Sequence, residues 1–409
     1  MNSKLLLLTA MLCIAITSLS QNRPNTETPM AVQSITSEDI NPFQQGNWNF
    51  DLNRIGRVNS QNAHYNGNKI AERNSLDISL RGTYFFANNI GVGLDLSASR
   101  EKSGLTTQYT QSELLGILSL TAGTRISNNF NLYGTVGYGI GSEKYKQEIP
   151  GGNDQSESFD ISRLQFAIGS PIRLGGTNVF LTPELGYSIR TIDYEIEEEQ
   201  KSMFQVRLGL ETYLRGSDIG CNPSHSAGMY NAGRSFIGYT TRASVGFGNY
   251  EFTYAGIPEP DKEDFNRLNV MFDYNRYVID NFAVGIEAGI RRVAYEPENS
   301  GVNYKSSELS WRLKPQLTYN FPFFQNSFVQ VGGGIGGSKY KEEYNNNTDE
   351  YKENMKMFDA YLGYNFFFAR NLALTPMFGY LVECWKEDGA DESVSYRGFD
   401  AALGVRFNF

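Results

Sequence analysis

The sequence predicts an all-β protein, an antiparallel up-and-down β-barrel whose strands cross a membrane. Apolar and polar residues alternate with a period of two through most of the chain, as in strands whose two faces have different surroundings. Aromatic residues make up 13% of the 409 residues, yet mean hydropathy is −0.40. After the N-terminus no uncharged apolar run is long enough for a membrane helix, so a chain that spans a membrane must cross it with strands.

The last strand, residues 395–409, shows this alternation most clearly. Its apolar face carries Phe399, Ala401, Leu403, Val405, Phe407 and Phe409, and its polar face carries Gly398, Asp400, Ala402, Gly404, Arg406 and Asn408. We expect the apolar face to contact lipid and the polar face to line a lumen. Aromatic residues at other strand ends, such as Tyr84 and Tyr380, suit the girdles at membrane interfaces. The alternative is a soluble β-sandwich or barrel, which would turn the apolar faces inward.

The N-terminal residues predict export. Lys4, the apolar stretch 5–19 and the small residues Ser18 and Ser20 form the pattern of a secretory signal peptide over residues 1–20. Residues 21–45 are polar and contain three prolines, so we expect a flexible periplasmic segment that is too short to be a plug domain.

Eight strands are predicted in a first barrel unit, residues 46–214. They cover residues 46–57, 75–86, 90–100, 109–125, 130–143, 159–172, 178–194 and 202–214. Tight turns, such as 88–89 and 175–177, alternate with longer polar loops, such as 58–74 and 144–158. Outer-membrane barrels have this asymmetry, with short periplasmic turns and long external loops, which predicts periplasmic termini.

A second barrel unit, residues 238–409, repeats the first after a linker, residues 215–237. An offset of 192 maps Asn89 onto Asn281, and an offset of 195 maps Gly139 onto Gly334. Self-similarity on this scale indicates a tandem duplication.

Each unit resembles the OmpA/OmpX-like family of small eight-stranded outer-membrane β-barrels. The resemblance lies in the opening strand Gly46-Asn47-Trp48 and in the Asn-Leu-Ala-Leu-Thr-Pro strand at 371–376. It covers nearly all of the mature chain, but the family usually has one unit per chain, and the second unit lacks the Trp. The resemblance implies a Gram-negative outer-membrane barrel whose terminal strand the barrel-insertion machinery recognises. The family contains structural proteins, adhesins, pores and lipid-modifying enzymes, so it leaves function open.

Two arrangements of the units are possible, because a sheet cannot leave an open edge in lipid. Two tandem eight-stranded barrels are favoured by the glycines on the inward face of the fifth strands, which suit a narrow barrel, and by the long linker. One sixteen-stranded barrel would instead enclose water. The predicted inward charges would pair across narrow barrels or set the ion selectivity of a wide one. They are Asp95, Glu113, Arg125, Glu184, Arg190, Arg207 and Glu211, followed by Glu287, Arg291, Glu308, Arg312, Lys314, Glu383, Asp400 and Arg406.

Little in the sequence points to catalysis. The formal net charge of −9 argues against nucleic-acid binding, and three dispersed cysteines suit neither a disulfide framework nor a metal site. His64 with Ser103 is a conceivable dyad of a lipid A-modifying enzyme, but the second unit has no matching histidine and no G-x-S-x-G motif occurs. We therefore expect no enzymatic activity, no cofactor and no catalytic or metal residues.

The sequence favours a non-enzymatic integral outer-membrane protein with a structural or extracellular-interaction role. A passive diffusion pore made of one sixteen-stranded barrel and a lipid A-modifying enzyme are the alternatives. The expected partners are outer-membrane lipid, lipopolysaccharide and the insertion machinery. The acidic loops are expected to solvate an exposed face or to bridge lipopolysaccharide phosphates through divalent cations.

Overall fold

The computed structural model describes residues 41–51, 55–105, 107–127, 130–150, 152–174, 178–194, 197–215, 228–238, 240–254, 261–297, 304–324, 326–344, 347–369, 371–390 and 392–409. Every regular element in these ranges is a β-strand, and the strands form one continuous sheet. No helix in these ranges has the length and apolarity needed to cross a membrane. The predicted signal peptide, residues 1–20, and most of the predicted linker lie outside the described residues.

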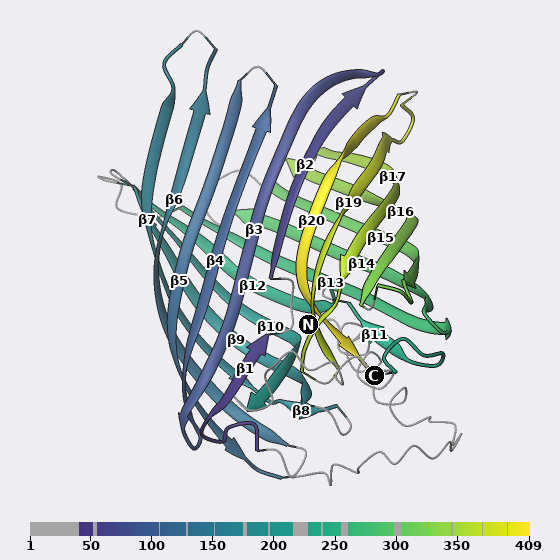
Figure 1. Ribbon diagram of the computed structural model, residues 1–409. Helices are drawn as coiled ribbons and strands as arrows, with labels where there is room; N and C mark the ends of the chain where they lie inside the picture. The colour runs from purple at the N-terminus through teal and green to yellow at the C-terminus, as the bar shows by residue number, and fades with distance from the viewer. Residues whose placement is uncertain are drawn as a thin grey trace.

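Sixteen long strands form the wall of one closed antiparallel barrel (Figure 1). They are β2 (Gly56–Tyr65), β3 (Asn68–Ala87), β4 (Ile90–Gly104), β5 (Gln108–Arg125), β6 (Asn131–Glu148), β7 (Gln155–Gly169), β9 (Val179–Asp193), β10 (Glu197–Arg215), β12 (Arg242–Tyr254), β13 (Asp261–Ile279), β14 (Phe282–Pro297), β15 (Tyr304–Asn320), β16 (Ser327–Tyr344), β17 (Asn347–Tyr364), β19 (Leu372–Glu387) and β20 (Val394–Asn408). β10 pairs with β12 to join the two halves, and β2 pairs with β20 to close the ring. The expectation of two separate eight-stranded barrels is therefore wrong, and the sixteen-stranded alternative is confirmed.

Four short strands modify this wall at the end that carries the tight turns: β1 (Asn47–Asp51), β8 (Ile172–Arg173), β11 (Ser235–Ile237) and β18 (Phe366–Ala369). β1 pairs with β10 and β3, whereas β11 pairs with β20 and β13. The chain thus changes partner between β1 and β2, and again between β11 and β12. Each half closes on itself at this end only, which gives two eight-stranded legs below the common barrel. We call them the first leg, closed by β1, and the second leg, closed by β11.

The faces of the wall have the polarity expected of a barrel in lipid. On the outer face Leu118, Ile140 and Phe399 are 66%, 68% and 57% exposed. On the inner face Asp400 and Arg406 are only 2% and 3% exposed. The predicted alternation is therefore confirmed, and the arrangement of a soluble barrel is excluded because the apolar side chains point outward.

An apolar seam packs the two legs against each other. Val405 and Phe407, which the sequence assigns to the lipid face, lie instead in a buried cluster with Val179, Leu214 and Ile237. The cluster joins outward-facing residues of both halves, because below the point where the wall divides, each leg covers part of the other's outer surface. Burial of this apolar area stabilises the divided end of the barrel.

Several predicted loops are parts of strands. The predicted loop 58–74 forms most of β2 and the start of β3, joined at Asn66 and Gly67 with φ of 50° and 78°. An Asn-Gly pair with two positive φ values is the turn that best matches strand twist. The predicted loop 144–158 shortens in the same way, to a connection between Glu148 and Gln155. Loop prediction fails here because these extensions lie beyond the apolar band and carry polar residues on both faces.

Two segments, one near the start of each leg in the sequence, are more ordered than the sequence predicts. Residues 41–46, at the end of the predicted flexible segment, form turns that bury Phe43 completely. Ser235–Ile237, which the sequence places in the linker, form β11. The asparagine turns of the repeat are confirmed, since Asn89 and Asn281 have φ of 69° and 66°.

Candidate functional site

The candidate site is the lumen, and its narrow end is filled by aromatic side chains in both legs. In the first leg Phe43, Phe85, Tyr133, Phe180 and Tyr213 form one buried cluster. The ring of Phe43 lies 5.6 Å from that of Phe85 and 6.1 Å from that of Tyr213, measured between centroids. An eight-stranded barrel has room for little more than its own side chains, so these rings close the leg.

The second leg is closed by a related but different cluster. Phe236, Tyr277 and Ala283 pack together beside Tyr230, which also meets Phe367 at 6.3 Å between ring centroids. The guanidinium of Arg406 lies 4.0 Å from the ring centroid of Phe236 and 4.3 Å from that of Phe328. This geometry is a double cation–π contact in a closed interior.

Phe43 and Tyr230 come from segments outside the sixteen long strands and are attached alike. The backbone N–H of Asn89 donates to the carbonyl oxygen of Phe43 at 2.7 Å, and that of Asn281 donates to the carbonyl oxygen of Tyr230 at 2.7 Å. The repeat thus places one inserted aromatic ring in each leg. Sequence reasoning missed both, and the only signal was the presence of aromatic residues shortly before each unit.

We call the aromatic cluster of the first leg the first plug and that of the second leg the second plug. Above the first plug, the predicted inward charges pair with one another. Glu184 contacts Arg207 at 3.0 Å and Arg81 at 3.2 Å, and accepts a hydrogen bond from the Tyr133 hydroxyl at 2.6 Å. Arg190 contacts Glu113 at 2.8 Å and Glu143 at 2.9 Å. The Glu184 pairs lie at the top of the first leg, whereas Arg190 lies higher, beside Lys201, where β10 already pairs with β12. At both levels the charges compensate one another.

The second half has its own buried network, built from six polar residues that sequence analysis only partly identified. Glu287 contacts Arg312 at 2.7 Å and Lys314 at 3.2 Å, and Lys314 also pairs with Asp359. Gln316 donates to Asp273. Sequence analysis selected Glu287, Arg312 and Lys314. It missed Asp273 and Asp359, which lie on the inner faces of β13 and β17.

The glycine runs, which the sequence analysis took as a sign of two narrow barrels, lie instead where the backbone of a neighbouring strand approaches closely. A Cβ at Gly334 would lie 2.2 Å from the carbonyl oxygen of Leu313, and one at Gly139 would lie 2.5 Å from Ile117. The close approach of a neighbouring strand leaves no room for side chains at such positions.

One part of the lumen wall is lined mainly by basic side chains. Where β10 meets β12, a cavity of about 360 Å³ is lined by Lys201, Arg207, Arg242, Arg267 and Arg291, and by no aspartate or glutamate among the described residues. Sequence analysis named only Arg207 and Arg291 of these five. We call this cavity the basic recess.

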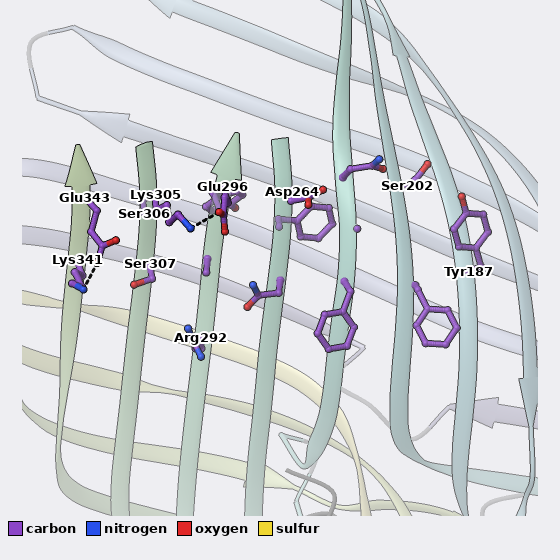
Figure 2. Close-up of a pocket in the computed structure, with 18 residues that line it drawn as sticks. Tyr187, Ser202, Asp264, Arg292, Glu296, Lys305, Ser306, Ser307, Lys341 and Glu343 are labelled. Carbon is purple, nitrogen blue, oxygen red and sulfur yellow. Dashed lines mark hydrogen bonds and ion pairs between the residues drawn. The ribbon is translucent and has the colours of Figure 1, made fainter. Parts of the chain in front are cut away.

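A second hollow, of about 790 Å³, lies towards the long-hairpin end of strands β9 to β16 (Figure 2). Arg292, which neighbours Arg291 in β14 and therefore points to the opposite, outer face, lines it. Its charges are mixed, because Lys305 pairs with Glu296 and Lys341 with Glu343 (Figure 2). Aromatic Tyr187 also lines it. This composition suits a membrane interface.

The conceivable catalytic pair is not assembled. His64 pairs with Lys69 and Ser395 in the sheet, whereas Ser103 pairs with Arg73 and Tyr109, so the two lie at different levels. No group of three or more His, Cys, Asp or Glu residues in the described ranges is arranged to hold a metal ion. Cys384 is free, and Cys13 and Cys221 lie outside those ranges.

No protein-family model matches the sequence, and no curated protein is significantly similar to it. Among solved structures, OccK1 (OpdK) of Pseudomonas aeruginosa aligns with 89% of this chain and 98% of its own, at 10% identity and a TM-score of 0.30. OccAB2 of Acinetobacter baumannii aligns with 90% and 99%, at 10% identity and a TM-score of 0.27. OccK2 (OpdF) of Pseudomonas aeruginosa, in complex with glucuronate, aligns with 90% and 99%, at 12% identity and a TM-score of 0.29. The fold assignment rests on the strand pairing described above, which supports an outer-membrane type of barrel but not tandem OmpA/OmpX-like units.

Proposed function

We propose that the protein is a gated solute channel of a Gram-negative outer membrane, with both termini in the periplasm. The observation that carries the proposal is the continuous sixteen-stranded wall, because a ring of that size encloses an aqueous lumen when its inner face is polar. Lipid and lipopolysaccharide surround the apolar wall, and the insertion machinery recognises β20. The proposal assigns no catalytic step to any residue.

The plugs make the channel closed in the conformation described. Phe43 and Tyr230 are the parts of the plugs that do not belong to the wall, so they are the parts that can leave without breaking it. Movement of these two segments would connect the common lumen with the periplasm through the legs. This is the step that we assign to gating.

A second candidate is a non-conducting barrel that acts through its long external hairpins. The specific observation in its favour is that both legs are filled by aromatic rings and paired charges. In that case the plugs would be permanent parts of a structural core.

Planar-bilayer conductance separates the two candidates. The refolded chain should give rare openings, and the double variant Phe43→Ala, Tyr230→Ala should open more often or with larger steps. Phe399→Ala, on the outer face, is the matched control for loss of an aromatic ring and should behave like the unchanged protein. If the folded double variant is as silent as the unchanged protein, the channel proposal is wrong and the structural candidate stands.

A further inference from the structure

Three of the five cations in the basic recess have no carboxylate partner among the described residues, whereas Arg207 pairs with Glu184 and Asp51. Lys201 lies over the rings of Tyr250 and Phe265, at 4.3 and 4.6 Å from their centroids, and forms no ion pair within the described residues. Arg267 and Arg291 likewise have no carboxylate partner there, and the Nε–H of Arg267 is buried without an acceptor. Uncompensated cations in a partly buried site repel one another and raise the free energy of the empty site.

Strand register brings these cations around a recess in the wall. Arg207, Ser244, Asn269 and Arg291 are successive partners across β10, β12, β13 and β14. One level above, Gln205, Gly246 and Arg267 are partners in the same way. At these two levels β12 contributes only the small residues Ser244 and Gly246 between the cations of its neighbours, which leaves space for a ligand.

The recess is open to the lumen. The side chains of Arg242 and Arg291 are exposed, while Arg267 is half-buried deeper in the recess. A volume of about 360 Å³ fits a small molecule rather than a polymer.

The repeat supplies an internal comparison, because the other junction between the halves, where β20 meets β2, has the same architecture. By the sequence offsets and strand pairing, Lys201, Arg207, Arg267 and Arg291 correspond to Tyr396, Ala402, Ser75 and Ser99. The one basic side chain on that face of β2, Arg57, is paired with Asp400 at 2.6 Å. The barrel therefore does not need unpaired cations at a junction, and their accumulation at one of the two requires another explanation.

We propose that the basic recess binds small oxyanions that carry two or more negative charges, either polycarboxylates or phosphate compounds. Several guanidinium groups around one recess match such ligands, since each can donate two hydrogen bonds to a carboxylate or a phosphate. The protein as a whole has more acidic than basic residues, 45 against 36, so the local excess of cations is not a consequence of composition. The proposal goes beyond the channel function and concerns binding alone, so it stands or falls separately from conduction.

Calorimetric titration of the refolded full-length chain in a non-ionic detergent tests the proposal, with citrate and inorganic pyrophosphate as probes at low salt. Saturable binding of either probe is expected, and the preferred one identifies carboxylate or phosphate as the natural chemistry. Arg267→Gln should weaken binding about tenfold or more, as expected for loss of a charge-assisted hydrogen bond. Added sodium chloride should weaken it further.

Two further variants keep the test decisive. Arg292→Gln removes the same charge from the same region of β14, but from the outer face, and should bind like the unchanged protein. Gly246→Asp should abolish binding, because its Cβ would lie 3.4 Å from Nε of Arg267 and its carboxylate would occupy the ligand position. Heat-modifiable migration verifies folding of each variant. The proposal is overturned if the unchanged protein binds neither probe, or if Arg292→Gln weakens binding as much as Arg267→Gln.

Discussion

Each leg buries one charged side chain at its closed end, an acidic one in the first leg and a basic one in the second. Glu211 in the first leg and Arg406 in the second occupy corresponding positions, paired in the sheet with Phe180 and Ala373. Glu211 accepts hydrogen bonds from Asn49, Thr182 and Tyr213, each at 3.2 Å. Arg406 instead lies between two aromatic rings. A leg therefore tolerates either sign of charge, provided that its immediate neighbours compensate it.

The basic recess differs from both legs in this respect. Charges inside the legs have partners and serve the fold, whereas Lys201, Arg267 and Arg291 of the recess have no carboxylate partner among the described residues and are available to a ligand. The two regions should therefore respond differently to loss of a charge.

The largest effect is expected from Lys314→Met in the second leg. The change leaves the carboxylates of Glu287 and Asp359 buried with one fewer cation, which should cost about 3–5 kcal/mol of unfolding free energy. Urea unfolding of the refolded protein, followed by the heat-modifiable gel band, measures it. The triple variant Lys314→Met, Glu287→Gln, Asp359→Asn should recover most of the loss, and a loss below about 1 kcal/mol in the single variant would contradict the assignment of a structural ion network.

A smaller effect is expected from Leu118→Arg on the outer face. Leu118 is 66% exposed, and in the proposed membrane this exposure is to lipid. An arginine there should cost about 2–4 kcal/mol near the bilayer centre. Refolding yield and unfolding in lipid vesicles measure the cost. Thr110→Arg lies on the same face of β5 near the long-hairpin end and should cost about 1 kcal/mol or less. Equal behaviour of the two variants would argue against a membrane around this wall.

The sequence was sufficient for the wall but not for its closure. Alternation placed Asp400 and Arg406 inside and Phe399 outside, because the period of a strand fixes the face of each residue. Alternation does not say which strand lies beside the first one. Both choices of partner satisfy the rule against open edges, and here the chain uses both, β10 for β1 and β20 for β2.

The plugs and the recess escaped prediction for related reasons. Phe43 acts from outside the strands, so no periodic pattern includes it. Arg267 lies on a strand whose position was predicted from the repeat, but its importance appears only when β10, β12, β13 and β14 are neighbours, a set that bridges the two halves. The burial of Val405 and Phe407 has the same cause, since only the contact between the legs removes them from lipid.

Arg406→Leu tests the cation–π contact of the second leg. The change keeps an apolar side chain between Phe236 and Phe328 but removes the charge, and should cost about 2 kcal/mol, the value for a desolvated cation between rings. The urea midpoint measures it. Arg276→Leu removes an exposed arginine from β13 and should change stability by about 0.5 kcal/mol or less. If the two variants are equally stable, the contact of Arg406 with the rings of Phe236 and Phe328 contributes nothing to stability.

The smallest effect is expected from Lys201→Met in the basic recess. Lys201 contacts two rings in a partly open site, so its loss should cost about 0.5–1 kcal/mol, and relief of repulsion from neighbouring cations offsets part of this. The same urea experiment measures it, with Lys314→Met as the paired comparison. Both variants replace one lysine on the inner wall by methionine, so they differ mainly in whether carboxylates are left behind. If Lys201→Met lowers the unfolding free energy as much as Lys314→Met, the recess cations stabilise the fold. If Lys201→Met leaves the unfolding free energy nearly unchanged but weakens oxyanion binding, the recess cations serve ligand binding.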